Sequence, residues 1–277
     1  MPFDNLTMPY RTRRCSPEHF LMKTKAGLLL AIVLVTMQSA HAADLVIFSA
    51  AAMKGALENL PENYLAATGD RVRLIYGTAG QVRDRAISGQ AFDLVIVPPE
   101  PLAKLTEQDL VRKGSQVDVA RVRLGVAVKA GAALPAINDD PAFTRALLDA
   151  PSIGMADPAT GATSGIYLAR LIDRLGIGGT VAPKVKYYPE GQTAMEAMAR
   201  GEVSLGLGQT SEIKPVHGVT LVGPIPEDLQ LVTTYAAGIG TKSEHPDAAQ
   251  KLLSYLTGPA VQTSLKANGF DLVSPTN

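Results

Sequence analysis

Short apolar runs alternate with longer amphipathic segments along most of the chain, and the two periods predict different elements. The predicted strands are Leu45–Phe48, Val72–Tyr76, Leu94–Val97, Arg123–Lys129, Ile153–Met155, Val185–Tyr188, Ser204–Gly208 and Val232–Ile239. The predicted helices are Lys54–Thr68, Gln81–Ser88, Pro99–Leu105, Pro141–Leu148, Ser164–Leu175 and Gln192–Arg200, with one or two more in His245–Ala267. Strands that alternate with helices predict an α/β fold whose sheets are mostly parallel.

The series of strands and helices breaks once, after the strand-like segment 122–129. A Gly/Ala/Pro stretch, Ala130–Ala136, follows it, and then a fresh series begins. We therefore predict lobe 1 at residues 43–125, lobe 2 at 126–225, and a return to lobe 1 with C-terminal helices at 226–277. The two crossings, near residues 125 and 230, would form a hinge.

The N-terminal region, residues 1–42, has the order of parts of a secretion signal. Lys23 and Lys25 precede an apolar run from Ala26 to Met37, and Ala40-His41-Ala42 offers a small-x-small cleavage site. We predict cleavage after Ala42 and a periplasmic protein, with Met22 as a possible true start. A permanent membrane anchor is the alternative, but the run is short for a span.

Charge and composition narrow the classes of ligand. Lys and Arg total 26 and so do Asp and Glu, which argues against a nucleic-acid partner. The chain has no Trp and 5% aromatic residues, which argues against a cleft that stacks on sugars. Its one cysteine, Cys15, precedes the apolar run, so the exported chain would have neither disulfides nor thiol chemistry. No motif indicates a cofactor.

Small residues follow predicted strands at three places: Ser49–Ala52, Gly77–Gly80 and Thr163–Gly165. The first N–H groups of a helix have no partner within it, and small side chains let an anion approach them. Ligands of open α/β sheets bind beyond the carboxyl ends of the strands, where these junctions lie. Such residues can also be plain core alanines or helix caps, as Thr78 and Ser164 could be. Their recurrence favours a site for a small anion.

Four segments, in this order, resemble the periplasmic molybdate-binding protein family of ABC importers: FSAAAMKGAL, YGTAGQVRDRAISGQAFDLVIV, ADPATGATSGIYLARLIDRLG and YLTGPAVQTSLKANGF. The resemblance implies a two-lobed type II periplasmic-binding-protein fold. It also implies that molybdate or a related oxyanion is held between the lobes by uncharged donors. The expected partners are an inner-membrane permease and its ATPase, and the protein would be a monomer.

Carried onto this chain, the resemblance and the junctions together predict a set of ligand-binding residues. They are Ser49, Ala50, Ala51, Ala52, Thr78, Ala79, Gly80, Ser164, Gly165, Gln192 and Gln209. The chain departs from the family inside this set, because Ala52 stands where the family has a serine and Gln209 where it has a tyrosine. Gln192 replaces a hydrophobic contact.

An organic carboxylate is therefore an alternative ligand, because amides donate as well as accept whereas an ionised oxyanion only accepts. Arg83 could pair with such a carboxylate or lie on a solvated helix face, and Lys54 has the same two interpretations.

Enzyme and metal chemistry are less well supported by the sequence. Ser211 and Lys214 match a Ser-x-x-Lys pattern, which makes a periplasmic serine enzyme a further alternative, but the companion motifs are missing. Four histidines, His19, His41, His217 and His245, lie singly without a metal-ligand pattern. Asp157 indicates a turn and Asp93 the start of a strand. We predict a binding protein rather than an enzyme.

Overall fold

The computed structural model describes residues 42–273. The predicted secretion signal, Cys15, His19 and His41 lie outside the described residues. Ten strands are described: β1 Asp44–Ala50, β2 Arg71–Gly77, β3 Leu94–Val97, β4 Val117–Lys129, β5 Ile153–Ala156, β6 Val185–Tyr188, β7 Leu205–Gln209, β8 Val219–Pro224, β9 Val232–Ile239 and β10 Phe270–Leu272.

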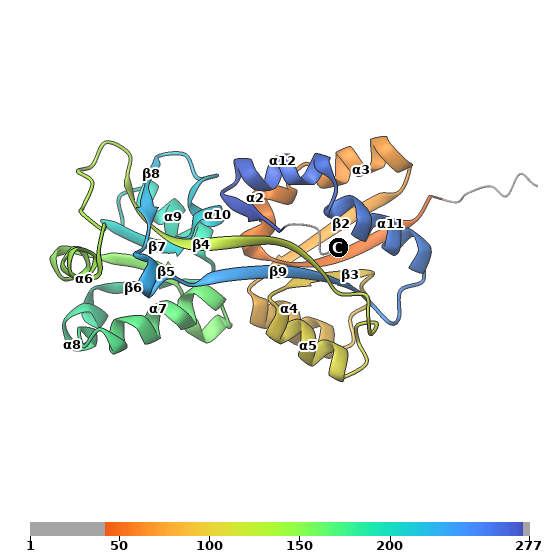
Figure 1. Cartoon of the computed structure of the whole chain (residues 1–277), viewed down its shortest axis with the longest axis horizontal. Coiled ribbons are helices and arrows are strands. Elements are labelled where there is room, and N and C mark those ends of the chain that lie inside the picture. Colours follow the sequence, from red (N-terminus) through yellow and green to blue (C-terminus); the bar gives the residue numbers. More distant parts are fainter. Residues whose placement is uncertain (1–41, 274–277) are drawn as a thin grey trace, which may run out of the picture. The chain divides into compact units, whose positions relative to one another are not determined.

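The helices connect these strands and cover their faces (Figure 1). The α-helices are α2 Lys54–Leu57, α3 Leu60–Thr68, α4 Ala79–Ile87, α5 Pro99–Glu107, α6 Asp140–Asp149, α7 Thr163–Arg174, α8 Gly178–Val181, α9 Gly191–Ala199, α10 Thr210–Ile213, α11 Pro246–Leu256 and α12 Pro259–Ala267. Short 3-10 helices are η2 Ala51–Met53, η3 Pro158–Thr160, η4 Ala182–Lys184 and η5 Glu227–Leu229.

Two lobes share one long strand. The strand order is β2-β1-β3-β9-β4-β7-β5-β6, with β8 and β10 also paired to β4. In lobe 1, β1 runs parallel to β2 and β3; in lobe 2, β5 runs parallel to β6 and β7. The strands β4, β8, β9 and β10 pair antiparallel. The α/β class and the two-lobed arrangement predicted from the sequence are confirmed.

The strand β4 changes partners half-way along, between Arg123 and Leu124. Its residues up to Arg123 pair with β9, and those from Leu124 pair with β7 and β8. Figure 1 shows β4 and β9 running side by side between the lobes. The side chain of Gln230 braces this crossing: its Oε1 accepts from Leu124 N at 2.7 Å, and its Nε2 donates to Leu124 O at 3.1 Å.

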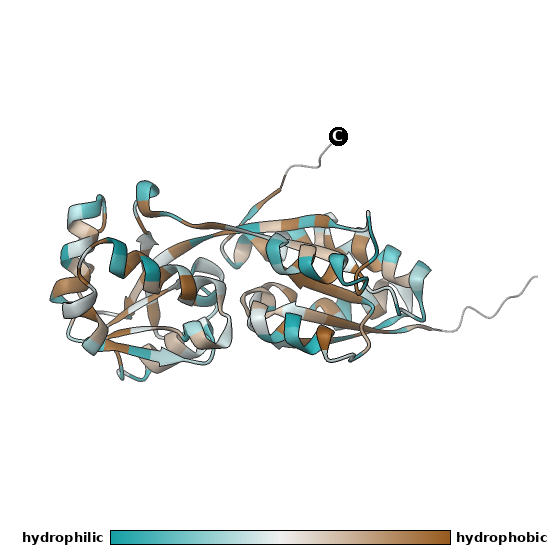
Figure 2. Ribbon diagram, turned by 90° about the horizontal axis from the view of Figure 1, so that it is seen from below, coloured by the Kyte–Doolittle hydropathy of each residue, from teal (hydrophilic) through white to brown (hydrophobic). Residues whose placement is uncertain are grey.

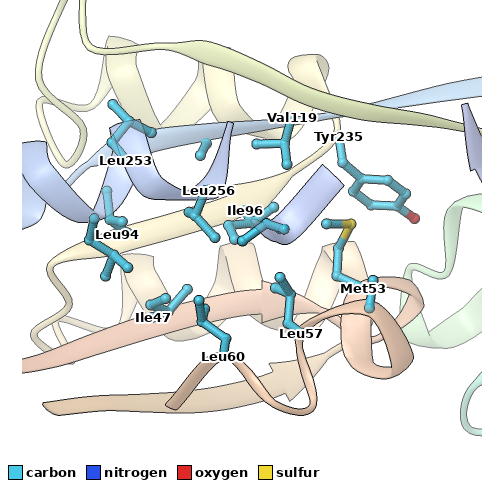
Figure 3. Packing of buried hydrophobic residues seen from close by; sticks show 14 of the residues in the cluster. Ile47, Met53, Leu57, Leu60, Leu94, Ile96, Val119, Tyr235, Leu253 and Leu256 are labelled. Atoms are coloured by element: carbon cyan, nitrogen blue, oxygen red, sulfur yellow. The ribbon is translucent and has the colours of Figure 1, made fainter. Parts of the chain in front are cut away.

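Each lobe has two clusters of buried apolar residues beneath its helices. Figure 2 shows apolar strands inside and hydrophilic outer helix faces. Figure 3 shows part of the lobe 1 core, with Ile47, Met53, Leu57, Leu60, Leu94, Ile96, Val119, Tyr235, Leu253 and Leu256. The lobe 2 core gathers around Leu124, Phe143, Met155, Leu168 and Leu207. These clusters anchor the strands whose ends form the site.

One predicted helix is wrong. Lys54–Thr68 is not continuous but divides into α2 and α3, preceded by the 3-10 turn η2. Pro61 lies at the start of α3. A proline has no N–H, and its ring clashes with the carbonyl four residues earlier, so one helix cannot run through this position. The elements β8, β10, α8 and α10 are additional to those predicted. Within residues 42–273, none of the helices combines the length and apolar character that crossing a bilayer requires.

Candidate ligand-binding site

A small cavity lies between the lobes, where five helical segments begin. Its lining residues are Ala50, Ala51, Ala52, Thr78, Ala79, Ala162, Thr163, Ser164, Glu190, Gly191, Gln209, Glu212 and Tyr235. The segments η2 and α4 bring their first residues from lobe 1, and α7 and α9 bring theirs from lobe 2. The helix α10, also in lobe 2, contributes Glu212 and the preceding residue, Gln209. The cavity volume is about 20 Å³. That is room for only one or two water molecules.

Two of these starts lack a side-chain cap. The residue before η2 is Ala50 and the residue before α7 is Ala162, and neither makes a capping hydrogen bond from its side chain. An alanine cannot accept from the free N–H groups that open a helix, so those groups keep their donor capacity. The uncapped starts come from opposite lobes and line the same cavity. Ser164, on the first turn of α7, adds a buried hydroxyl.

The lobes touch directly beside the cavity. Gly80 N donates to Gly161 O at 3.1 Å, and the Thr78 hydroxyl donates to Thr160 O. A Cβ atom on Gly80 would lie 2.8 Å from the Cα of Gly161, and one on Gly161 would lie 2.7 Å from the Cα of Gly80. Real Cβ atoms do not approach so closely, so glycine at both positions permits this contact. We call these two hydrogen bonds and the glycine contact the interlobe latch.

Gln209 presents an amide donor without a partner. Its Oε1 accepts from the Tyr235 hydroxyl at 2.8 Å, while its Nε2 is buried and makes no hydrogen bond. Figure 3 shows the Tyr235 hydroxyl pointing away from the aliphatic core of lobe 1. A buried donor without an acceptor costs free energy, and a ligand oxygen would supply the missing bond. Burial raises the pKa of Tyr235, so its hydroxyl remains protonated.

Glu212 places a carboxyl group in the same lining. Its Oε1 accepts from Gly191 N and its Oε2 from Gln209 N, both at 3.2 Å. A Cβ atom on Gly191 would lie 2.2 Å from Glu212 Oε2, so only glycine admits the carboxyl here. Burial raises the pKa of Glu212 to about 7, although the two backbone donors act in the other direction.

No lysine or arginine is among the lining residues of this cavity. Arg83 pairs with Asp84 at 2.7 Å and lines a separate interlobe groove, and Lys54 is exposed. The charged groups of the lining are the carboxyls of Glu190 and Glu212. Any anion bound here is therefore held by hydrogen-bond donors, as predicted from the sequence. It also lies near carboxyl groups, which the sequence does not predict.

The structure brings seven of the predicted residues together in the lining. They are Ala50, Ala51, Ala52, Thr78, Ala79, Ser164 and Gln209. Four others lie outside it. Ser49 is buried and donates to Ala50 O, Gly80 belongs to the interlobe latch, and Gln192 donates to Glu196 at 3.0 Å. Gly165 is required for packing, because a Cβ there would lie 2.4 Å from Ala156 O.

Glu190, Gly191, Glu212 and Tyr235 also line the cavity, and sequence reasoning does not select them. Glu212 carries a usable signal: it follows Gln209 by three residues, at the end of an apolar strand. That spacing gives the capping box that the structure contains at α10. A glutamate held there points back toward the strand end, which is where the ligand is expected.

The alternative catalytic pair does not form. The Ser211 hydroxyl is buried without a hydrogen-bond partner, and Lys214 is exposed. An activated serine needs its base within hydrogen-bond reach. Asp93 accepts from Val46 N and from the Ser243 hydroxyl, and Asp157 accepts from Ala159 N, so both carboxylates have structural roles. In the described part of the chain, His, Cys, Asp and Glu residues form no group that could hold a metal ion.

Residues 45–271 match the model of a family described as bacterial extracellular solute-binding protein. The chain belongs to this family. Its members are solute-binding proteins of ABC transporters, and the two lobes with a cavity between them suit that role.

Two curated relatives bear different names. An aconitate isomerase from a Pseudomonas species is 30% identical over 231 residues, which cover 81% of this chain and 86% of the relative. The molybdate-binding protein of Escherichia coli K12 is 22% identical over 252 residues, covering 89% of this chain and 96% of the relative.

Among solved structures, the periplasmic molybdate-binding protein of Azotobacter vinelandii superposes with a TM-score of 0.70 at 21% identity. It covers 83% of this chain, and the match spans 100% of that structure. The solute-binding protein described here therefore has the type II periplasmic-binding-protein fold, and the resemblance to the molybdate-binding family is confirmed.

Proposed function

We propose that this protein is the periplasmic component of an ABC importer and that it captures a small organic carboxylate between its lobes. The uncapped starts of η2 and α7, facing one cavity from opposite lobes, carry the proposal. Each hydrogen bond from such a donor to a charged acceptor contributes about 1.5–3 kcal/mol. Donors on both lobes make binding depend on closure. The captured ligand would then be passed, by a monomer, to a membrane permease and its ATPase.

The choice between a carboxylate and molybdate rests on Gln209 and Glu212. A tetrahedral oxyanion offers acceptors only, and Gln209 Nε2 could serve either ligand. An ionised Glu212 would accept a hydrogen bond from a ligand that carries a hydroxyl group, which molybdate lacks, whereas a neutral Glu212 would donate to either ligand. The relative at 30% identity takes its name from a tricarboxylate, which agrees with this choice. Molybdate is the competing ligand. Since the cavity measures about 20 Å³, either ligand requires the lobes to open for its entry and the cavity walls to move apart to hold it.

A thermal-shift screen tests the proposal. The compounds are molybdate, tungstate, sulfate, phosphate, citrate, cis-aconitate and trans-aconitate. A ligand at a hundred times its Kd stabilises the fold by about 2.7 kcal/mol, which raises Tm measurably. We expect a polycarboxylate to give the largest shift. A shift with molybdate alone would replace the proposed ligand, and no shift with any compound would reject the proposed site.

Two glutamines provide a matched pair of variants for this screen. Gln209→Leu removes the unpartnered donor from the cavity, whereas Gln192→Leu alters an amide that is bonded to Glu196 outside the lining. We expect the first to weaken binding by about tenfold, and the second to leave it unchanged. Circular dichroism and the melting temperature of both variants check that they keep the fold.

Isomerisation of an unsaturated carboxylic acid is a second candidate function, and Glu212 is the observation that favours it. A carboxyl group with a pKa of about 7 can take and return a proton near neutral pH. The name of the aconitate isomerase from Pseudomonas points to the same chemistry. Proton NMR of trans-aconitate with the protein in D2O would show deuterium uptake and the cis isomer. If neither appears, and trans-aconitate nevertheless binds, capture alone is the function.

A further inference from the structure

We propose that this site takes up a proton together with its anion, and that Glu212 holds that proton. The inference rests on the proposed function, because it requires an anion in the cavity. It adds that the affinity depends on pH and that the carboxyl of Glu212, when neutral, acts as a donor toward the ligand.

The charge around the cavity carries the argument. The lining has two carboxyls, no lysine and no arginine. Glu212 is 6% exposed, so water screens little of its charge. An ionised Glu212 would repel an anion across this cavity, and no neighbouring cation would offset the repulsion. A protonated Glu212 removes the repulsion and offers an O–H donor at the same place.

The hydrogen bonds of Glu212 are compatible with either protonation state. Each of its oxygens accepts one backbone N–H, from Gly191 or from Gln209. Since a carboxyl oxygen has two lone-pair directions, a proton can occupy the remaining one without breaking these bonds. Gly191 provides the space for the carboxyl. The pKa of about 7 places the change of state in the neutral range, and a bound anion would raise it further.

Titratable groups on the neighbouring elements do not supply a counter-charge. Glu190, before α9, and Tyr235, on β9, are the groups that bear on Glu212, and neither is cationic. Lys214, at the end of α10, and Lys54, on α2, are exposed. Arg123, on β4, pairs with Glu227 and Asp271, and Glu196, on α9, bonds to Gln192.

A purely structural role is the competing explanation. Glu212 joins the starts of α9 and α10 through its two accepted bonds, and an ionised carboxylate does this well. In that case it would stay ionised with ligand bound. Binding would take up no proton, and the affinity would not vary with pH in the neutral range.

Calorimetry in paired buffers distinguishes the two explanations. Binding of trans-aconitate, and of molybdate, is measured at about pH 8 in Hepes and in Tris, whose ionisation enthalpies differ and neither of which is an anion of the screen. Both probes are fully ionised at this pH, so any proton taken up on binding is bound by a group of the protein. We expect close to one proton per ligand and an affinity that falls nearly tenfold for each pH unit above neutrality.

Two glutamate variants complete the experiment. Glu212→Gln should bind without proton uptake, and Glu190→Gln, which alters the other carboxyl of the lining, should retain it. Zero uptake by the unaltered protein would overturn the inference, even if Glu212→Gln fails to fold. Uptake that persists in a folded Glu212→Gln variant would also overturn it. Absence of binding heat with every probe would instead reject the proposed function.

Discussion

Gly80, in the interlobe latch, affects ligand affinity although it lies outside the cavity lining. We predict that Gly80→Ala weakens ligand binding without destabilising the unliganded fold. Gly80 is the second residue of α4, where alanine is a better helix former than glycine. Its backbone is not in the left-handed region, so alanine introduces no strain within lobe 1. The obstacle is in lobe 2, where the added Cβ would lie 2.8 Å from Gly161 Cα.

The size of the effect follows from the contacts that closure makes. An ordinary contact needs about 3.4 Å or more, so the lobes must stay further apart by roughly half an ångström. That separation weakens the hydrogen bond from Gly80 N to Gly161 O and the one from Thr78 to Thr160 O. Each contributes about 0.5–1.5 kcal/mol, so their joint loss corresponds to a Kd raised about 5-fold to 150-fold.

Calorimetry with the ligand found in the screen measures this change. The matched control is Gly179→Ala, because Gly179 is also the second residue of a helix, α8, and a Cβ there meets nothing within 4 Å. The control should bind as the unaltered protein does. Small-angle scattering should show a liganded Gly80→Ala variant that is less compact. Unchanged affinity for Gly80→Ala would mean that the ligand-bound lobes do not reach this contact, and the reasoning would fail.

Three further outcomes are expected. Ser164→Ala, which removes a buried hydroxyl from the cavity, should raise Kd about tenfold by calorimetry, and an unchanged Kd would exclude that contact. The pKa of Glu212 rises from 4.5 to about 7 on folding, so the folded state binds the extra proton between these values. The contribution of Glu212 to the free energy of unfolding is fully present below pH 4.5 and is lost as the pH rises through 7. It amounts to about 3 kcal/mol in urea unfolding, and Glu212→Gln should flatten this dependence. Leu57→Ala, at a fully buried position, should cost about 2–5 kcal/mol of unfolding free energy, whereas Leu134→Ala, 61% exposed, should change it by less than about 0.5 kcal/mol; equal costs would contradict the assigned core.

Much of the fold can be predicted from the sequence, because its central strands are buried on both faces. The run Leu94–Val97 is predicted with the bounds that β3 has, since all four residues are apolar and buried. The strand β8 escapes prediction because its residues are half-buried or exposed and no apolar face stands out. The helix α10 has four residues, too few for a helical period to show. The lobe limits at residues 125 and 225 stay a prediction.

The site is harder to predict from the sequence than the fold, because residues from segments far apart in the chain meet there. Thr78 and Ser164 follow strands in different lobes, and a local rule for free N–H groups selects both. The same rule cannot separate Gly165, which packs on Ala156, from residues that face the cavity. Glu212 lies in the polar segment 209–214, and its place in the site depends on Gly191, a residue of another helix. Only three-dimensional packing reveals such a pairing.

The openings of η2 and α7, which line the cavity, offer main-chain N–H groups that no side chain caps. Only a substitution by proline removes a peptide N–H. Other mutations therefore leave these N–H donors in place and change only the side chains that line the cavity. Duplicated genes could therefore diverge in cargo through exchanges at positions such as Gln209 and Glu212, without rebuilding the scaffold. The two curated relatives, one named for aconitate and one for molybdate, agree with such divergence.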